Sequence, residues 1–205
     1  MKKVPLVFCM LLLLTQAKLV QAQSISQLGP NYYVAGVPSI DFYEVAEIGS
    51  QRCPEWCWAA CSQMILNYHG LYVTQEQVVT KIFGSLQCQS ASTVDILNAL
   101  SGWAPDMRGS YSTIHSEEGT YGPDDLVKIL SYKWPLLVCL KNPDGSGHAE
   151  VMTAVYYATD AGNNALIDKV VLRDPWPYNP SRQEMSWAEF TSRIQSIVRV
   201  WVVRN

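Results

Sequence analysis

Residues 51 to 61 hold the side chains with the clearest chemical potential, because a glutamine stands six residues before a cysteine that begins a helical pattern. A thiol in the first turn of a helix meets the positive end of the helix dipole, which favours the nucleophilic thiolate. An amide at a fixed distance upstream can donate a hydrogen bond to the oxygen that becomes negative when a carbonyl carbon is attacked. Gln51 and Cys57 therefore predict acyl transfer, with Cys57 as the nucleophile.

A thiol nucleophile needs a base, and three histidines follow it, His69, His115 and His148. His69 lies at the far end of the helix that Cys57 begins, about three turns away. His148 opens an apolar strand, where its ring can face the start of a helix and accept the thiol proton. We predict His148 as the base and keep His115, in a polar segment, as the second candidate.

The base needs a group that orients its ring, and Asp174 stands at the end of a later strand that Pro175 stops. A carboxylate on one ring nitrogen fixes the histidine tautomer and stabilises the imidazolium. Asp174 is therefore the predicted orienting residue, although Asp-Pro is also a common turn signal. Asp168 and Glu150 are weaker candidates. Alternation puts Glu150 on the strand face of His148, but at an unsuitable distance.

These motifs resemble those of papain-like cysteine peptidases, above all compact bacterial forms such as secreted effector peptidases, staphopains and bacteriocin-leader peptidases. The family has glutamine six residues before Cys-Trp-Ala, which Gln51 and residues 57–59 match, and a small residue before His-Ala, which residues 147–149 match. Its third member is Asn two residues before Trp, or Asp-Pro in compact forms, and residues 174–176 combine both. The resemblance extends from about residue 48 to the C terminus.

The resemblance implies a peptidase with a Cys57–His148–Asp174 triad, an oxyanion hole made by Gln51 and the Cys57 amide, and no cofactor or metal. Two features depart from the family pattern. His148 follows Cys57 by 91 residues, whereas the larger enzymes have about 130–150. Glu55-Trp56 stands where the family usually has Gly-Ser. These larger side chains would narrow the cleft, or Glu55 would add a negative charge that opposes thiolate formation.

Hydrophobic periodicity and capping residues predict helices in the first half of the chain and strands in the second. The two halves predict an α+β domain in which an N-terminal helical subdomain packs against a C-terminal antiparallel sheet, with the active-site cleft between them. Residues 103–120 are expected to form a loop with short strands. The predicted helices are 57–68, 75–83, 93–102, 123–132 and a short one after Ser186; the predicted strands are 135–141, 148–158, 169–173 and 197–204.

The first 22 residues have the layout of a secretory signal peptide, with a basic head, a short apolar run and a small-residue cleavage site. The run is too short to span a membrane, and no cysteine follows the cleavage site closely enough for a lipid anchor. We therefore expect a secreted or periplasmic protein. Residues 23–47 are expected to be an extended arm, and residues 48–205 a single peptidase domain.

The charge of the mature chain bears on its partners. Without the three lysines of the first 22 residues, 12 basic and 18 acidic residues remain, a net charge of −6. This sign is a poor match for nucleic acid or anionic lipid. The predicted partner is a peptide or protein substrate, and the predicted oligomeric state is a monomer.

Five cysteines follow the predicted cleavage site. An odd number in an oxidising compartment indicates one working thiol and up to two disulfides. The favoured bridges are Cys53–Cys88 or Cys61–Cys88, and the alternative for Cys61 and Cys139 is that both are small buried apolar residues.

Three rival functions stay open at this point. The same triad can serve an amidase or an acyl transferase. Cys53, Cys57 and Cys61, spaced by four, would bind a metal only if the helix began before Pro54, which disfavours it. A catalytically silent binding domain of this fold is the third.

Overall fold

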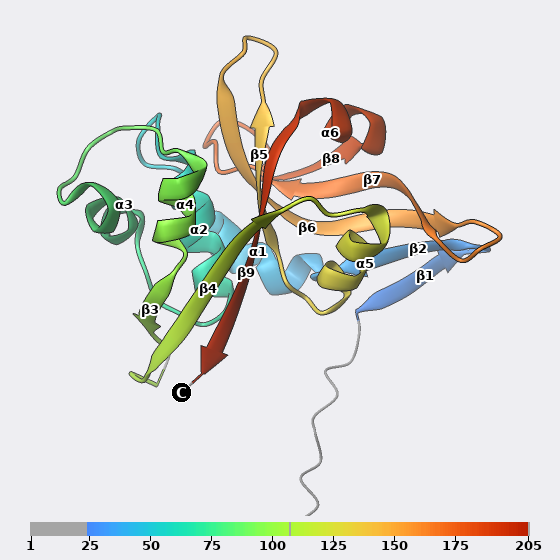
Figure 1. The fold of residues 1–205 in the computed structure, drawn as a ribbon, viewed down its shortest axis with the longest axis horizontal. Coiled ribbons are helices and arrows are strands. Elements are labelled where there is room, and N and C mark those ends of the chain that lie inside the picture. Colours follow the sequence, from blue (N-terminus) through green and yellow to red (C-terminus); the bar gives the residue numbers. More distant parts are fainter. Residues whose placement is uncertain (1–23, 107, 205) are drawn as a thin grey trace, which may run out of the picture.

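The computed structural model describes residues 24–106 and 108–204, in which one antiparallel sheet carries helices on both of its faces (Figure 1). Most helices of the first half lie together at one end, and the strands of the second half extend away from them. In chain order the elements are β1 (Ile25–Gly29), β2 (Tyr32–Gly36), α1 (Ser39–Ile48), α2 (Cys57–Tyr68), α3 (Gln75–Phe83), α4 (Thr93–Ala99), β3 (Gly102–Pro105), β4 (Tyr111–Gly119), α5 (Pro123–Ser131), β5 (Leu136–Lys141), β6 (Gly147–Thr159), β7 (Ala165–Arg173), β8 (Arg182–Ser186), α6 (Trp187–Arg193) and β9 (Ile194–Arg204).

Strand β6 organises the sheet, whose strand order is β1-β2-β6-β5-β9-β4-β3. The first half of β6 pairs with β5, the second half pairs with β2, and β7 pairs with β6 and β8. The register places Arg173, the last residue of β7, opposite Val151. Asp174 therefore follows β7 directly beside the beginning of β6, where His148 lies.

Each face of the sheet packs against its own helices. Leu137 of β5 joins the core that α1 to α4 bury, whereas its neighbours Leu136 and Val138 join the core under α5 and α6. Such alternation follows from the two-residue period of a strand. Helix α2 is buried from Trp58 to Leu66 and packs on β6, so the residue at its first turn is held against the beginning of that strand.

The predicted helix starts are confirmed where capping residues mark them. Thr74 and Gln77 form a reciprocal capping box at α3, and Ser92 and Asp95 form one at α4. Each box satisfies two of the backbone N–H groups that a helix start leaves without partners. The α+β class, with the helical subdomain packed on an antiparallel sheet, is confirmed.

Residues 23–47 were expected to form an extended arm, but most of this segment forms two strands and a helix. β1 and β2 form a hairpin that adds to the second half of β6, and α1 contributes the fully buried Phe42 to the core. Both strands have only five residues; β1 is mostly exposed and β2 is half-buried to buried, so neither shows an alternation of apolar and polar residues that could be detected. The predicted signal peptide, residues 1–22, lies outside the described residues.

Two other segments also differ from expectation. Residues 111–119 form the nine-residue strand β4, which pairs with β9 along its length, rather than part of a loop. Strand β8 was not predicted. Its polar sequence is accommodated because β8 pairs only with β7, at an edge of the sheet. Among the described residues, no helix combines the length and apolar character needed to cross a membrane.

Candidate active site

Cys57 is the first residue of α2, as predicted. The chain reaches it through a turn in which the Trp56 amide donates to the Cys53 carbonyl at 3.0 Å. An amide in the first turn of a helix has no partner within the helix, so the Cys57 N–H is available to an incoming oxygen. The half-buried thiol lines a cleft between the two subdomains, at the positive end of the α2 dipole.

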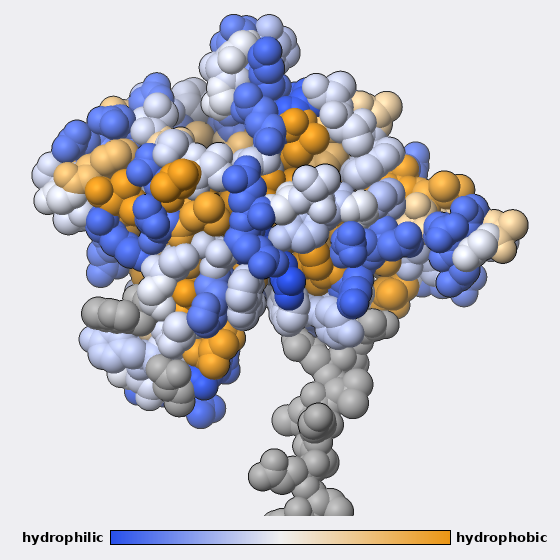
Figure 2. Space-filling view, in the orientation of Figure 1, coloured by the Kyte–Doolittle hydropathy of each residue, from blue (hydrophilic) through white to orange (hydrophobic). Residues whose placement is uncertain are grey.

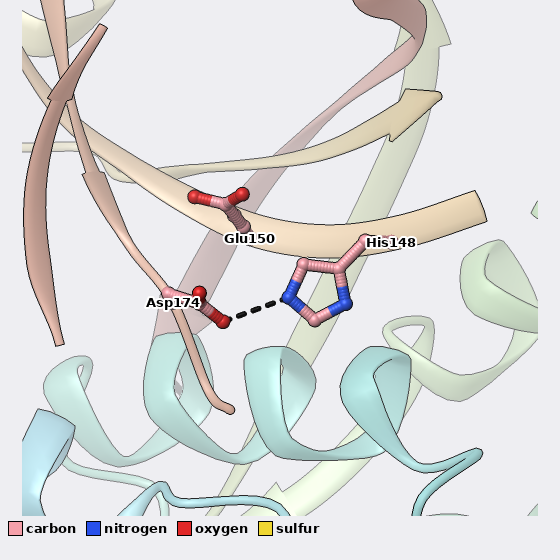
Figure 3. A group of neighbouring side chains, drawn as sticks. All are labelled: His148, Glu150 and Asp174. Atoms are coloured by element: carbon pink, nitrogen blue, oxygen red, sulfur yellow. Dashed lines mark hydrogen bonds and ion pairs between the residues drawn. The ribbon is translucent and has the colours of Figure 1, made fainter. Parts of the chain in front are cut away.

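His148 shares this cleft, and its Nε2 lies 2.7 Å from Oδ1 of Asp174 (Figure 3). The other ring nitrogen is left for Cys57. Burial lowers the pKa of His148, but hydrogen bonds with Asp174 and Cys57 and the charges of both outweigh it, so the pKa is raised from 6.5 to about 10. The ring is therefore an imidazolium at neutral pH, which places a positive charge beside the Cys57 thiol.

Asp174 is almost completely buried, and both of its oxygens accept hydrogen bonds. Oδ1 also accepts from the Trp176 amide at 2.8 Å, and Oδ2 accepts from Asn179 Nδ2 at 2.7 Å and from Gln183 Nε2 at 2.9 Å. Burial alone would raise the pKa of Asp174, but the donors, His148 and Asn179 foremost, lower it. Sequence reasoning missed Asn179 and Gln183, because neither stands in a recognisable motif.

Glu150 is the second carboxylate beside this pair, and its side chain lies next to His148 and Asp174 (Figure 3). One ligand atom from each of the three residues lies within 4.8 Å of the others, but the carboxylate within hydrogen-bond distance of the ring is that of Asp174. Glu150 is only 4% exposed, and its Oε2 has no hydrogen-bond partner among the described residues. Burial, and then the charge of Asp174, raise the pKa of Glu150 to about 7.

His148, Glu150 and Asp174 have the atom types that bind a divalent cation. A cation would have to displace the proton of an imidazole whose pKa is about 10 and break the bond to Asp174. The three residues are therefore better suited to a protonated His148 that is hydrogen-bonded to Asp174 than to a metal centre.

Gln51 lies beneath the turn that leads to Cys57 and does not line the cleft. Its Nε2 donates to the carbonyl oxygens of Cys53, at 3.1 Å, and Pro54, at 2.9 Å. Its backbone amide donates to the Pro175 carbonyl at 2.8 Å, which ties this turn to the one that follows Asp174. Gln51 thus connects the chain segments that carry the thiol and the carboxylate.

The cleft has a volume of about 520 Å³ and walls from both subdomains. Glu55 is one of the residues that line the helical wall. One wall consists of Glu55, Cys57, Trp58, residues 90–93 and Ile96, and the other of Cys139, residues 146–149, Gln195 and Ser196.

Three links fasten residues 87–89, which lead into the helical wall. Cys53 and Cys88 form a disulfide with a Cα–Cα distance of 5.9 Å. Trp56 Nε1 donates to the Gln87 carbonyl at 2.6 Å, and Trp58 Nε1 donates to the Gln89 carbonyl at 3.1 Å. Trp56 is thus buried as an anchor and does not narrow the cleft.

The disulfide also decides two open alternatives. The bridge is Cys53–Cys88, not Cys61–Cys88, and Cys53 is not free to join a three-thiol metal site with Cys57 and Cys61. Cys61 is fully buried, and its thiol donates to the Ala149 carbonyl at 3.2 Å. Cys139 is half-buried and lines the cleft as a free thiol.

The remaining candidates lie elsewhere. His69 follows the last residue of α2, and burial lowers its pKa to about 4. His115 lies on β4 and stacks on Trp201, with ring centroids 5.2 Å apart. Asp168 accepts a hydrogen bond from the Tyr32 hydroxyl at 2.7 Å. None of these three lines the cleft that holds Cys57.

The fold and the sequence together define a cysteine-type peptidase. The sequence profile described as papain-like cysteine protease AvrRpt2 matches residues 41–195. The chain belongs to this family of papain-like cysteine proteases. No curated protein sequence matches it.

Solved structures show a similar fold. The peptidase domain of Streptococcus ComA, a bi-functional ABC transporter involved in a quorum sensing pathway, is 13% identical, with a TM-score of 0.51 over 76% of this chain and 96% of that one. A double glycine motif protease from an AMS/PCAT transporter, in complex with its leader peptide, is 16% identical, with a TM-score of 0.46 over 76% of this chain and 89% of that one. At these identities the likeness concerns the fold alone.

Proposed function

We propose that Cys57, His148 and Asp174 form the catalytic triad of a secreted, monomeric enzyme that hydrolyses peptide bonds in peptide or protein substrates. One observation carries the proposal: the imidazole that shares the cleft with the Cys57 thiol is bonded, on its other side, to a buried carboxylate at 2.7 Å. The imidazolium can thus stabilise a thiolate at the start of α2 and later supply a proton to a leaving group.

In this mechanism the Cys57 thiolate attacks the carbonyl carbon of the substrate. The Cys57 N–H donates a hydrogen bond to the oxyanion. The Gln51 side-chain amide becomes the second donor by giving up one of its hydrogen bonds to the carbonyl oxygens of Cys53 and Pro54. A donor of this kind contributes about 2.7–4 kcal/mol. His148 protonates the leaving amine and then takes a proton from the water that hydrolyses the thioester. No cofactor takes part in these steps.

Covalent labelling tests the assignment of the nucleophile. The mature protein is incubated with a thiol-reactive epoxide inhibitor, and the modified residue is mapped by mass spectrometry. We expect one adduct, on Cys57, absent from Cys57→Ala and formed at least about tenfold more slowly in His148→Ala. Cys139, a free thiol in the same cleft, is the internal control. Equal labelling of Cys57 and Cys139 would contradict a specially reactive Cys57.

Substrate screening separates the proposal from its rivals. A peptidase cleaves internal peptide bonds, whereas an amidase acts only on small amides and an acyl transferase requires an acceptor amine. If the folded protein cleaves none of the substrates and the inhibitor does not label Cys57, the result would favour a catalytically silent binding domain.

The proposed secretion rests on the basic and apolar pattern of residues 1–22 and is supported by the Cys53–Cys88 disulfide. Sequencing the N terminus of the exported protein tests it, with Gln23 as the expected first residue. Light scattering of the same sample tests the monomer. An exported protein that keeps Met1, or one that stays inside the cell, would contradict the signal peptide.

A further inference from the structure

The cleft holds a single unpaired carboxylate. Among the described residues that line it, Glu55 is the only ionisable side chain apart from His148 and the cysteines. Glu55 is exposed, and it makes no hydrogen bond or ion pair with any described residue. Most of the remaining lining residues are small and neutral, Ser, Ala, Thr, Gly and Cys. The cleft therefore combines open space with a carboxylate that is paired with no described residue.

Glu55 is also held at a fixed place relative to the thiol. The Cys53–Cys88 disulfide fixes the turn that carries Glu55. The Gln51 side-chain amide donates hydrogen bonds to the carbonyl oxygens of Cys53 and Pro54 in the same turn. The next side chain, Trp56, is buried and bonded to Gln87. A backbone this constrained limits the positions that the carboxylate can reach, which favours its use in recognition.

The two walls of the cleft indicate which part of a substrate Glu55 meets. The leaving amine must lie against His148, on the sheet wall, because this residue protonates it in the proposed mechanism. Glu55 stands on the helical wall, two residues before Cys57. The residue whose carbonyl carbon bonds to Cys57 therefore lies close to Glu55.

We propose that Glu55 selects substrates with lysine or arginine on the amino-terminal side of the cleaved bond. The inference rests on the proposed function and names the substrate class of the same site. A guanidinium or ammonium group can form charge-assisted hydrogen bonds with this carboxylate. The small side chains that line the cleft, whose whole volume is about 520 Å³, leave room for the long aliphatic stem of such a residue.

Fluorogenic peptides that differ only in the residue before the cleaved bond, Arg, Lys, Ala or Glu, provide the test. The measured quantity is the ratio of kcat/KM for the arginine peptide to that for the alanine peptide. We expect a high ratio in the wild type, a fall of about tenfold in Glu55→Gln, and a preference for the glutamate peptide in Glu55→Lys. Glu47→Gln, which removes an exposed carboxylate of α1 outside the cleft, should leave the ratio unchanged.

A ratio is used because a substitution beside the nucleophile can alter the rates for all peptides together, and such a common change cancels in the ratio. The ratio should also fall as salt is raised from 0.05 to about 0.5 M, since salt screens an exposed charge pair.

The outcomes distinguish this inference from the proposed function. A wild type that cleaves peptides through Cys57 without preferring basic residues, or whose preference survives in Glu55→Gln, overturns the role of Glu55 alone. A wild type that cleaves no peptide and gives no Cys57 adduct overturns the proposed function. Far-UV and near-UV circular dichroism of Glu55→Gln shows that the variant is folded before either conclusion is drawn.

Discussion

Nε2 of His148 lies 2.7 Å from Oδ1 of Asp174, although the two residues stand 26 positions apart in the chain. The contact follows from the pairing of β6 with β7, which sets Arg173 opposite Val151. Each partner is supported separately, His148 by its strand and Asp174 by three further donors, so the distance is set by the fold and not by flexible side chains.

Replacing Asp174 by asparagine tests this contact. The amide has nearly the same shape but no charge, so it stabilises the imidazolium of His148 far less and can leave the ring in the wrong tautomer. We expect kcat/KM for peptide cleavage to fall at least about tenfold. Asp168→Asn is the matched control on β7, because its carboxylate binds Tyr32 outside the cleft, and it should retain activity. Equal losses in both variants would contradict a special role for Asp174.

The pH profile of peptide cleavage reports on His148. Its pKa is raised to about 10, so the imidazolium persists through neutral pH and is lost only as the pH rises through that value. We expect the alkaline limb of kcat/KM near pH 10 in the wild type, and at lower pH in Asp174→Asn, which lacks the charge that raises this pKa.

The second histidine candidate provides the control for that profile. His115→Ala removes a ring that stacks on Trp201 outside the cleft, so its profile should match the wild type. His148→Ala should lower kcat/KM by about a hundredfold or more. An alkaline limb near pH 6.5 in the wild type would mean that His148 carries no raised pKa.

Glu150 should make stability depend on pH. Its pKa is raised from 4.5 to about 7, so the folded protein holds a proton that the unfolded chain has released between these values. Stability linked to this group is therefore complete below pH 4.5 and is lost as the pH rises through about 7. Glu150→Gln, which stays neutral, should be more stable than the wild type at pH 8, by about 1–3 kcal/mol, and equal to it at pH 4.

Urea unfolding at both pH values measures the effect of Glu150→Gln. Glu184→Gln is a suitable control, because this exposed carboxylate pairs with Lys169 and Arg182, and its pKa is lowered, so its removal should give no gain at pH 8. A Glu150→Gln protein less stable than the wild type at pH 8 would show that the ionised carboxylate supports the imidazolium.

Gln51 has two separable contributions, to the turn and to the oxyanion. Gln51→Ala should lower kcat by about 10²–10³ if its amide reaches the oxyanion. Gln75→Leu serves as control, because the buried Gln75 supports the same turn through Ser50 and Arg52 without reaching the cleft. If the two variants lose similar amounts of stability, kcat should fall further in Gln51→Ala than in Gln75→Leu. Equal kcat values in the two variants would mean that Gln51 only supports the turn.

The Cys53–Cys88 disulfide joins two residues that stand 35 positions apart in the chain. Replacing both cysteines by serine should cost about 2–4 kcal/mol of unfolding free energy, measured in urea. The paired indole bonds of Trp56 and Trp58 should keep the wall near its place, so the double variant should retain inhibitor labelling of Cys57. Complete loss of labelling in a folded variant would instead make the disulfide necessary for the cleft.

Local patterns were sufficient to predict the positions of most elements. The helix of Cys57, the capping boxes at Thr74 and Ser92, and the strand that His148 opens were all found where their own residues indicated. These features depend on neighbours within a few positions, which one sequence displays. The hairpin β1–β2 and strand β8 were missed because these strands have only five residues each and carry no apolar alternation.

The sequence by itself determined which residue begins the helix, which histidine opens a strand and that an aspartate ends another. Only the tertiary structure decided that Glu150 lies beside the pair, that Asn179 and Gln183 hold the carboxylate, and that Cys53 bonds Cys88. Those relations depend on strand register and on loops brought together across the chain. Side chains that meet through pairing of distant segments leave no periodic signal in the sequence.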